Sequence, residues 1–106
     1  MLNGHNNMNW SDPDGMPIGG VAIGMGFTIS WQNGPLGRGA DRRAPNGAFV
    51  EDVLDACRSR LNFYQDNKFS CPENATALEH ITQAMEALEA RTKDREEREV
   101  EGTHEI

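Results

Sequence analysis

Three arginines lie close together in a glycine-rich stretch of the chain. Arg38, Arg42 and Arg43 follow Gly34 and Gly37, and no acidic cluster of similar size accompanies them. A guanidinium group binds phosphate through two parallel hydrogen bonds, and glycine lets a ligand approach the backbone closely. The stretch therefore indicates an anion-binding loop. The alternative is that these arginines pair with the acidic second half of the chain.

Aromatic side chains that can stack on a nucleotide base are also present, namely Trp31, Tyr64 and Phe69. Arg91 and Arg95 are four residues apart, so they share one face of a predicted helix. Together these residues favour a site for a small phosphorylated molecule. The alternative for the arginine pair is a solvated ion-pair network with the neighbouring acidic residues.

Catalytic and metal-binding motifs are not indicated. Cys57 falls on the apolar stripe of a predicted helix, where we expect a small buried hydrophobe. Cys71 lies at a predicted helix start, and no histidine is near it in the sequence. The histidines lack metal-ligand spacing, and Cys-x-x-Cys, Walker and Gly-x-Ser-x-Gly motifs do not occur. We therefore expect no enzymatic activity, no metal and no cofactor.

Charge and length exclude several classes of protein. The 106 residues suit one domain, and 10 basic against 17 acidic residues give a net charge of −7, which argues against binding long nucleic acid. No apolar run is long enough to cross a membrane, and residues 1–10 lack the basic and apolar regions of a signal peptide. We expect a cytosolic protein with reduced cysteines. So small a domain buries little surface, which favours self-association.

The first part of the chain is predicted to be irregular or β. Residues 1–20 are polar and turn-rich, which predicts a flexible arm. Large apolar residues alternate with small or polar ones from Val21 to Gln32, which predicts one strand with a single large apolar face. Residues 33–45 are predicted to form a loop, so residues 21–45 make up a β and loop part.

Residues 46–106 are predicted to form two helices packed as an antiparallel hairpin. The first begins after Asn46 as its N-cap and ends near Asp66. The second begins at a capping box formed by Ser70 and Glu73 and ends at Gly102. The predicted apolar stripes consist of Phe49, Val50, Val53, Leu54, Cys57, Leu61 and Tyr64 in the first helix, and Leu78, Ile81, Met85 and Leu88 in the second.

Three stretches carry a more specific pattern: residues 31–39, 46–53 and 69–104. The last combines Phe-x-Cys-x-Glu-Asn, Arg-Thr-x-x-Arg and Gly-Thr-His. In this combination the chain resembles the phage anti-Thoeris / anti-CBASS sponge group over about residues 27–104. The resemblance implies an α+β fold, a small N-terminal antiparallel sheet followed by a long helical hairpin, within a sponge domain of residues 21–106.

The resemblance also implies a function in the cytoplasm of the infected host. Members assemble as dimers and hexamers and bind immune second messengers, which are cyclic ADP-ribose isomers and cyclic oligonucleotides. They hold the messenger without cleaving it, in pockets between subunits. A purely structural hairpin that pairs with a host or virion protein, and an enzyme that degrades the messenger, are the alternatives.

Site residues follow from the same resemblance. Tyr64 is expected to stack on the base, Asn74 to contact it through polar groups, and Arg91 to hold phosphate. Arg38 is expected to add a second phosphate contact. Glu99 stands where the family usually has glycine, which adds negative charge near the tail. Further candidates, for a separate cyclic-oligonucleotide site, are Arg95, Thr103 and His104.

Overall fold

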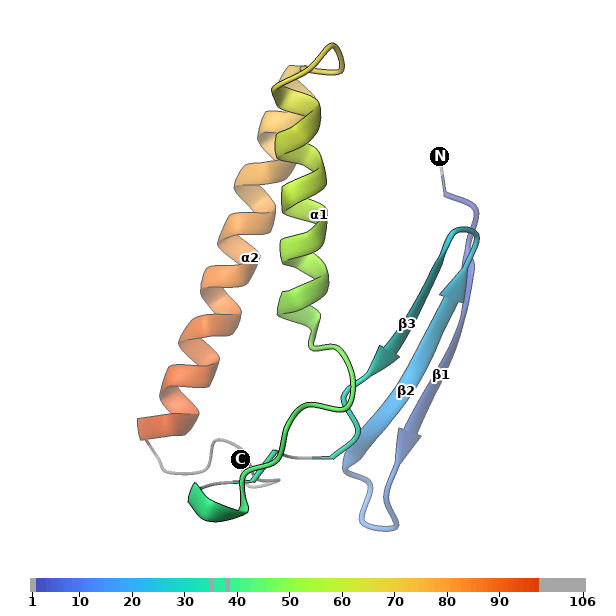
Figure 1. Ribbon diagram of the computed structural model, residues 1–106, viewed down its shortest axis with the longest axis vertical. Coiled ribbons are helices and arrows are strands. Elements are labelled where there is room, and N and C mark those ends of the chain that lie inside the picture. Colours follow the sequence, from blue (N-terminus) through green and yellow to red (C-terminus); the bar gives the residue numbers. More distant parts are fainter. Residues whose placement is uncertain (1, 35, 38, 98–106) are drawn as a thin grey trace. The chain divides into compact units, whose positions relative to one another are not determined.

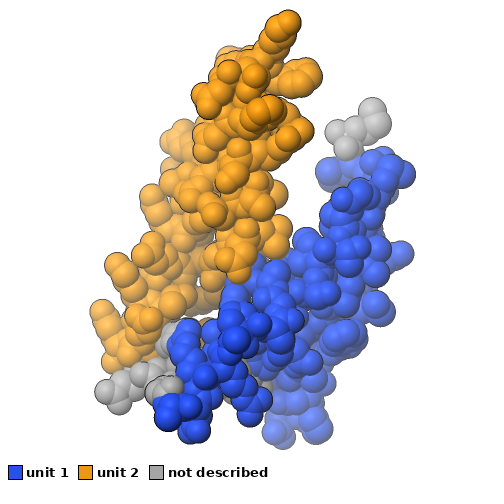
Figure 2. Space-filling model, in the orientation of Figure 1, with its two compact units in different colours: residues 1–49, 98–106 blue, residues 50–97 orange. Residues whose placement is uncertain are grey.

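A computed structural model describes residues 2–34, 36–37 and 39–97 (Figure 1). The described chain is α+β: a three-stranded antiparallel sheet is followed by two helices. It divides into two compact units, with the boundary between Phe49 and Val50 (Figure 2). The first unit contains the sheet, and the second is the helical hairpin.

The sheet contains β1 (His5–Ser11), β2 (Pro17–Gly24) and β3 (Phe27–Trp31) in the order β1-β2-β3. The Asp12 carboxylate closes the turn between β1 and β2, where it accepts hydrogen bonds from the backbone N–H groups of Asp14 (2.9 Å) and Met16 (3.0 Å). This short-range bonding is typical of aspartate in turns.

The expectation of a flexible arm over residues 1–20 is corrected by the structure, because β1 and the first part of β2 lie there. The antiparallel register pairs His5 with Gly24 and Met8 with Val21. The strand conformation of this asparagine-rich segment thus comes from pairing with β2, a tertiary contact that overrides local propensity.

The single strand expected over residues 21–32 is also wrong, because the chain reverses at Met25-Gly26. Gly26 has a φ of 85°, a left-handed conformation that suits glycine in a tight turn. Gly24 pairs with Phe27 across this turn, so Ala22 faces Ile29 while Val21 and Ile23 lie on the opposite face. The large apolar residues are therefore divided between both faces of the sheet. A two-residue turn leaves the alternation in the sequence unbroken, which hides the reversal.

The outer edge of β3 is partly occupied by the segment that leads to the helices. Ala48 forms a parallel bridge with Trp31, donating its N–H to the Ser30 carbonyl (2.8 Å) and accepting the Gln32 N–H (3.0 Å). A Cβ on Gly47 would lie 2.6 Å from the Trp31 carbonyl oxygen, so only glycine fits this approach.

Asn46 holds this segment in place and is not the N-cap that the sequence predicts. Its side-chain oxygen accepts the Asn33 N–H (2.8 Å), and its side-chain nitrogen donates to the Asn33 carbonyl (3.0 Å). Its own N–H donates to the side-chain oxygen of Gln32 (2.9 Å). Because Asn46 is used in this way, the first helix begins only at Val50.

The hairpin consists of α1 (Val50–Gln65) and α2 (Pro72–Glu97), which run side by side in opposite directions (Figure 1). With 16 and 26 residues they are about 24 and 39 Å long, so the end of α2 extends past α1. The predicted end of the first helix near Asp66 is confirmed, since α1 ends at Gln65.

The predicted end of the second helix at Gly102 lies outside the described residues. Neither described helix is long and apolar enough to cross a membrane.

The start of α2 is one residue later than the capping box predicts, since Cys71 and not Ser70 precedes its first residue. Gln65 ties this point to the end of α1. Its side chain accepts the Cys71 N–H (2.9 Å) and donates to the Cys71 carbonyl (3.1 Å). Both bonds cross the loop, so they fix how tightly the hairpin turns.

Burial in the hairpin is only partial. The four predicted seam residues of α2 are half-buried, whereas Cys57 of α1, expected to be buried, is exposed. No residue of either helix is fully buried, and in the described chain the buried hydrophobic core is Ala22 alone. Among the described residues each helix packs against one other helix, so its apolar stripe is only partly covered.

We predict that Asn46→Ala lowers the free energy of unfolding by about 1–2 kcal/mol, because it removes both side-chain bonds to Asn33. Asn46→Asp keeps the acceptor but loses the donor, so its loss should be smaller. Urea titration measures the effect, with Asn3→Ala, at an exposed site outside every strand and helix, as the control. Equal stability of Asn46→Ala and the control would show that the segment is held in another way.

Candidate functional site

Three predicted site residues come together at the end of the hairpin where α1 passes into α2: Tyr64 and Asn74, named from the family resemblance, and Phe69, named as a stacking aromatic. The rings of Tyr64 and Phe69 meet edge to face, with centroids 5.7 Å apart and planes at 80°. Asn74, in the first turn of α2, donates its side-chain N–H to the Phe69 carbonyl (3.0 Å). These contacts hold the Phe69 loop against both helices.

Arg60 joins this group and was not singled out by the sequence analysis. Its guanidinium carbon lies 5.0 Å from the Tyr64 ring centroid and 5.2 Å from that of Phe63. Its Nε donates to the Tyr64 hydroxyl (3.2 Å). The spacing of three and four residues along α1 was the signal available in the sequence. We call Arg60, Phe63, Tyr64, Phe69 and Asn74 the tip cluster.

The tip cluster presents aromatic surface to water. Phe69 is 72% exposed and Phe63 54% exposed, while Tyr64 is half-buried. Exposed rings beside a guanidinium suit a ligand that has both a flat base and negative charge. The Asn74 amide adds a donor and an acceptor at the same place.

Arg91 lies far from the tip cluster within one copy of the chain. It follows Asn74 by 17 residues in α2, which corresponds to about 25 Å along the helix axis. Its Nη2 is 3.7 Å from a carboxylate oxygen of Glu51 on α1, and the two side chains are 55% and 33% exposed. An exposed ion pair of this length is weak, so it leaves the guanidinium available to a ligand. One copy alone does not bring Arg91 together with Tyr64 and Asn74.

The remaining candidates are dispersed. Trp31 ends β3 in the sheet unit and is half-buried beside Ala48. Arg95 is half-buried on α2, one turn beyond Arg91. Arg38, Thr103 and His104 lie outside the described residues.

The predicted anion-binding loop, which carries Arg42 and Arg43, folds back on itself. The Arg43 N–H donates to the Leu36 carbonyl (2.6 Å), and a one-turn helix (Gly39–Asp41) lies between them. Gly37 has a φ of 84°, and a Cβ there would be 2.8 Å from the Asp41 carbonyl oxygen. Arg42 and Arg43 are exposed on this loop.

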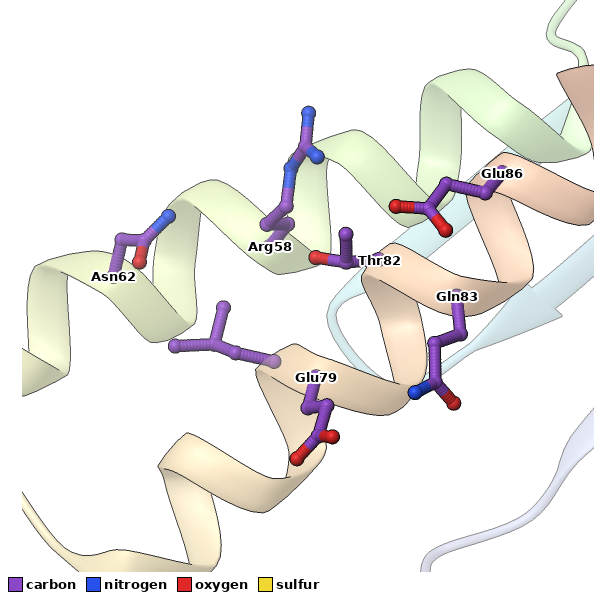
Figure 3. A pocket seen from close by; sticks show the side chains of 7 residues that line it. Arg58, Asn62, Glu79, Thr82, Gln83 and Glu86 are labelled. Atoms are coloured by element: carbon purple, nitrogen blue, oxygen red, sulfur yellow. The ribbon is translucent and has the colours of Figure 1, made fainter.

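A groove of about 400 Å³ between α1 and α2 is a less suitable anion site (Figure 3). Glu79 and Glu86 line it, and its arginine, Arg58, is already paired with Asp55 at 2.7 Å. Carboxylates would repel a phosphate there. Within the described residues, no group of three His, Cys, Asp or Glu side chains is placed to hold a metal ion.

Comparison with known proteins shows the family to which this chain belongs. The model of the Acb2/Tad1 hairpin domain matches residues 26–93, which include β3, α1 and most of α2. Thoeris anti-defense 1 of Bacillus phage SBSphiJ7 is 38% identical over 78 residues, covering 74% of this chain and 52% of that protein. The chain thus spans about half the length of this curated relative. It belongs to the Acb2/Tad1 hairpin-domain family, which confirms the resemblance to the phage anti-Thoeris / anti-CBASS sponge group.

Proposed function

We propose that this protein is a phage anti-defence sponge that binds nucleotide immune messengers in the host cytoplasm and holds them uncleaved. The messengers are cyclic ADP-ribose isomers, cyclic oligonucleotides or both. The observation that carries the proposal is the tip cluster, in which a chain of contacts links Arg60 to Tyr64, Tyr64 to Phe69 and Phe69 to Asn74 within the family's hairpin domain. It offers stacking surface, hydrogen bonds and positive charge, which are means of binding a nucleotide.

Contacts inside the tip cluster favour tight binding. Arg60 bonds to the Tyr64 hydroxyl, and Asn74 bonds to the Phe69 backbone, so both rings are positioned before a ligand arrives. A sponge must compete with the effector for its messenger. A Kd of 1 nM corresponds to about 12 kcal/mol, and ordering groups in advance keeps more of the contact energy available for binding.

Phosphate recognition by Arg91 requires a second copy of the chain. Along α2, Arg91 and Asn74 are about 25 Å apart, farther than one small nucleotide site extends. A pocket that contains both is formed when the tip of one hairpin lies beside the far end of α2 from another. Such an arrangement also covers the half-exposed apolar stripes. We therefore propose a homo-oligomer, a dimer or hexamer, with its pockets between copies.

A second candidate function is a helical hairpin that pairs with a host or virion protein. The exposure of Phe63 and Phe69 favours it, because exposed aromatic side chains are also typical of protein interfaces. The arginines would then be surface ion pairs, as Arg91 and Glu51 are in the described chain.

The first test is a thermal-melt screen with cyclic ADP-ribose isomers and with cyclic di- and trinucleotides. A messenger at 1,000 times its Kd should stabilise the protein by about 4 kcal/mol. Heating the complex should return the messenger intact, whereas an altered messenger would indicate an enzyme. No shift with any messenger would favour the protein-pairing function.

The second test is Arg91→Ala. We expect binding to weaken by at least about tenfold while the fold is retained, because a charged hydrogen bond to phosphate contributes about 1.5–3 kcal/mol and the Glu51 contact contributes little. Isothermal titration calorimetry measures the loss. Lys93→Ala removes an exposed cation from the same helix and should bind normally. Normal binding by Arg91→Ala would remove this residue from the site.

The third test asks whether each pocket is shared between copies. Tyr64→Ala and Arg91→Ala should each weaken binding at every site of the pure variant, so the mixture is titrated at a messenger concentration that only unmodified sites bind. After the two are unfolded and refolded together at equal amounts, about a quarter of the sites should bind, since half of the dimers are mixed and one of their two pockets is intact. If none of the sites in the mixture regains binding, both residues act from the same copy of the chain.

A further inference from the structure

The outer edge of β1 is unpaired within the described residues. The strand order places β1 at one side of the sheet, and all seven of its residues are exposed. The opposite side is different, because Ala48 bonds to the outer edge of β3 at Ser30 and Gln32. The sheet therefore has one edge partly covered, at Ser30 and Gln32, and leaves the other as a row of backbone donors and acceptors.

β1 also lacks the features that keep an edge strand from pairing with other chains. Its sequence, His-Asn-Asn-Met-Asn-Trp-Ser, contains no lysine, arginine, acidic residue or proline. The one irregularity in its pairing lies at its end, between Trp10 and Ser11, so His5–Trp10 is regular. An uncharged, regular and exposed edge is a template for one more strand.

The face of the sheet next to this edge is apolar and open to water. Met8 and Trp10 of β1 are 49% and 45% exposed, and Ile23 of β2 is 43% exposed. The register puts Met8 opposite Val21 and Asn6 opposite Ile23, so these side chains share one face. A strand added at β1 would extend this face and cover part of it.

We propose that β1 pairs antiparallel with β1 of a second copy and joins the two sheets into one. An antiparallel strand pair has twofold symmetry, so one strand edge is complementary to itself. Pairing about Met8 places Met8 opposite its counterpart and Trp10 opposite Asn6 of the second copy. Residues of the same face then stay on the same face, and the apolar patches of both copies merge.

This interface belongs to the sheet unit and does not rest on the proposed function. It differs from the hairpin contact that forms the proposed pockets, since all of its residues precede Phe27. No charge has to be buried to form it, because the strand has none of the four charged residue types. The pairing supplies both backbone hydrogen bonds and apolar contact.

The first experiment introduces a charge at the symmetry axis of the full-length chain. Met8→Lys places two like charges opposite each other, and sedimentation velocity should show assemblies of at most half the unmodified mass. Met25→Lys changes an 80% exposed residue in the turn between β2 and β3, and should leave the mass unchanged. Circular dichroism confirms that both variants are folded. An unchanged mass for folded Met8→Lys would overturn the proposal.

The second experiment traps the pair directly. In a Cys57→Ser, Cys71→Ser background, oxidised Met8→Cys should give a disulfide-linked dimer, since opposed residues in antiparallel strands have Cα atoms about 4.5–5.5 Å apart. Met25→Cys should remain monomeric on a non-reducing gel. Equal cross-linking of both variants would contradict the pairing, and so would cross-linking of Met8→Cys to a host protein instead of a second copy. A chain that cross-links through Met8→Cys but binds no messenger would refute the proposed function alone.

Discussion

Each unit of this protein buries only a small part of its apolar side chains. A hairpin of two helices gives each helix a single neighbour, and a sheet of three strands offers two faces. Neither unit can enclose large side chains by itself, and the only buried hydrophobic residue of the described chain is the small Ala22. Contacts between copies or with a ligand, as proposed above, would add the burial that each unit lacks. The exposed rings of Phe63 and Phe69 are open to such contacts.

The sequence predicted the helical part well and the β part poorly, for physical reasons. Leu78, Ile81, Met85 and Leu88 repeat with helical period, and this repeat alone determines which face of α2 packs on α1. The reversal at Met25-Gly26 leaves no such trace, since the alternation passes through the turn. Asn46 has the chemistry of an N-cap, but its side chain bonds to Asn33 instead, and local propensity contains no information about such long-range bonds.

The candidate site was likewise only partly predicted from the sequence. The family resemblance named Tyr64 and Asn74, the stacking argument named Phe69, and contacts join the three. Neither named Arg60, whose place over two rings follows from its position one turn before them on α1. Arg91 is separated from this group because a helix is rigid and rises a fixed distance per residue. A pattern within one sequence does not show whether such distant residues meet, since in the proposed pocket they would come from two copies.

The two proposed interfaces, one on each unit, would together set the symmetry of the assembly. The β1 edge would pair with itself about one twofold axis, and a pocket shared reciprocally between two hairpins would imply another. A chain with two different twofold contacts builds a closed ring of dimers when the axes meet at a suitable angle, and an open array otherwise. Three dimers closed in this way make a hexamer, the larger of the two proposed assemblies. In such a proposed assembly the net charge of −7 per chain would keep particles apart, while arginines in each proposed pocket would keep the local charge favourable to phosphate.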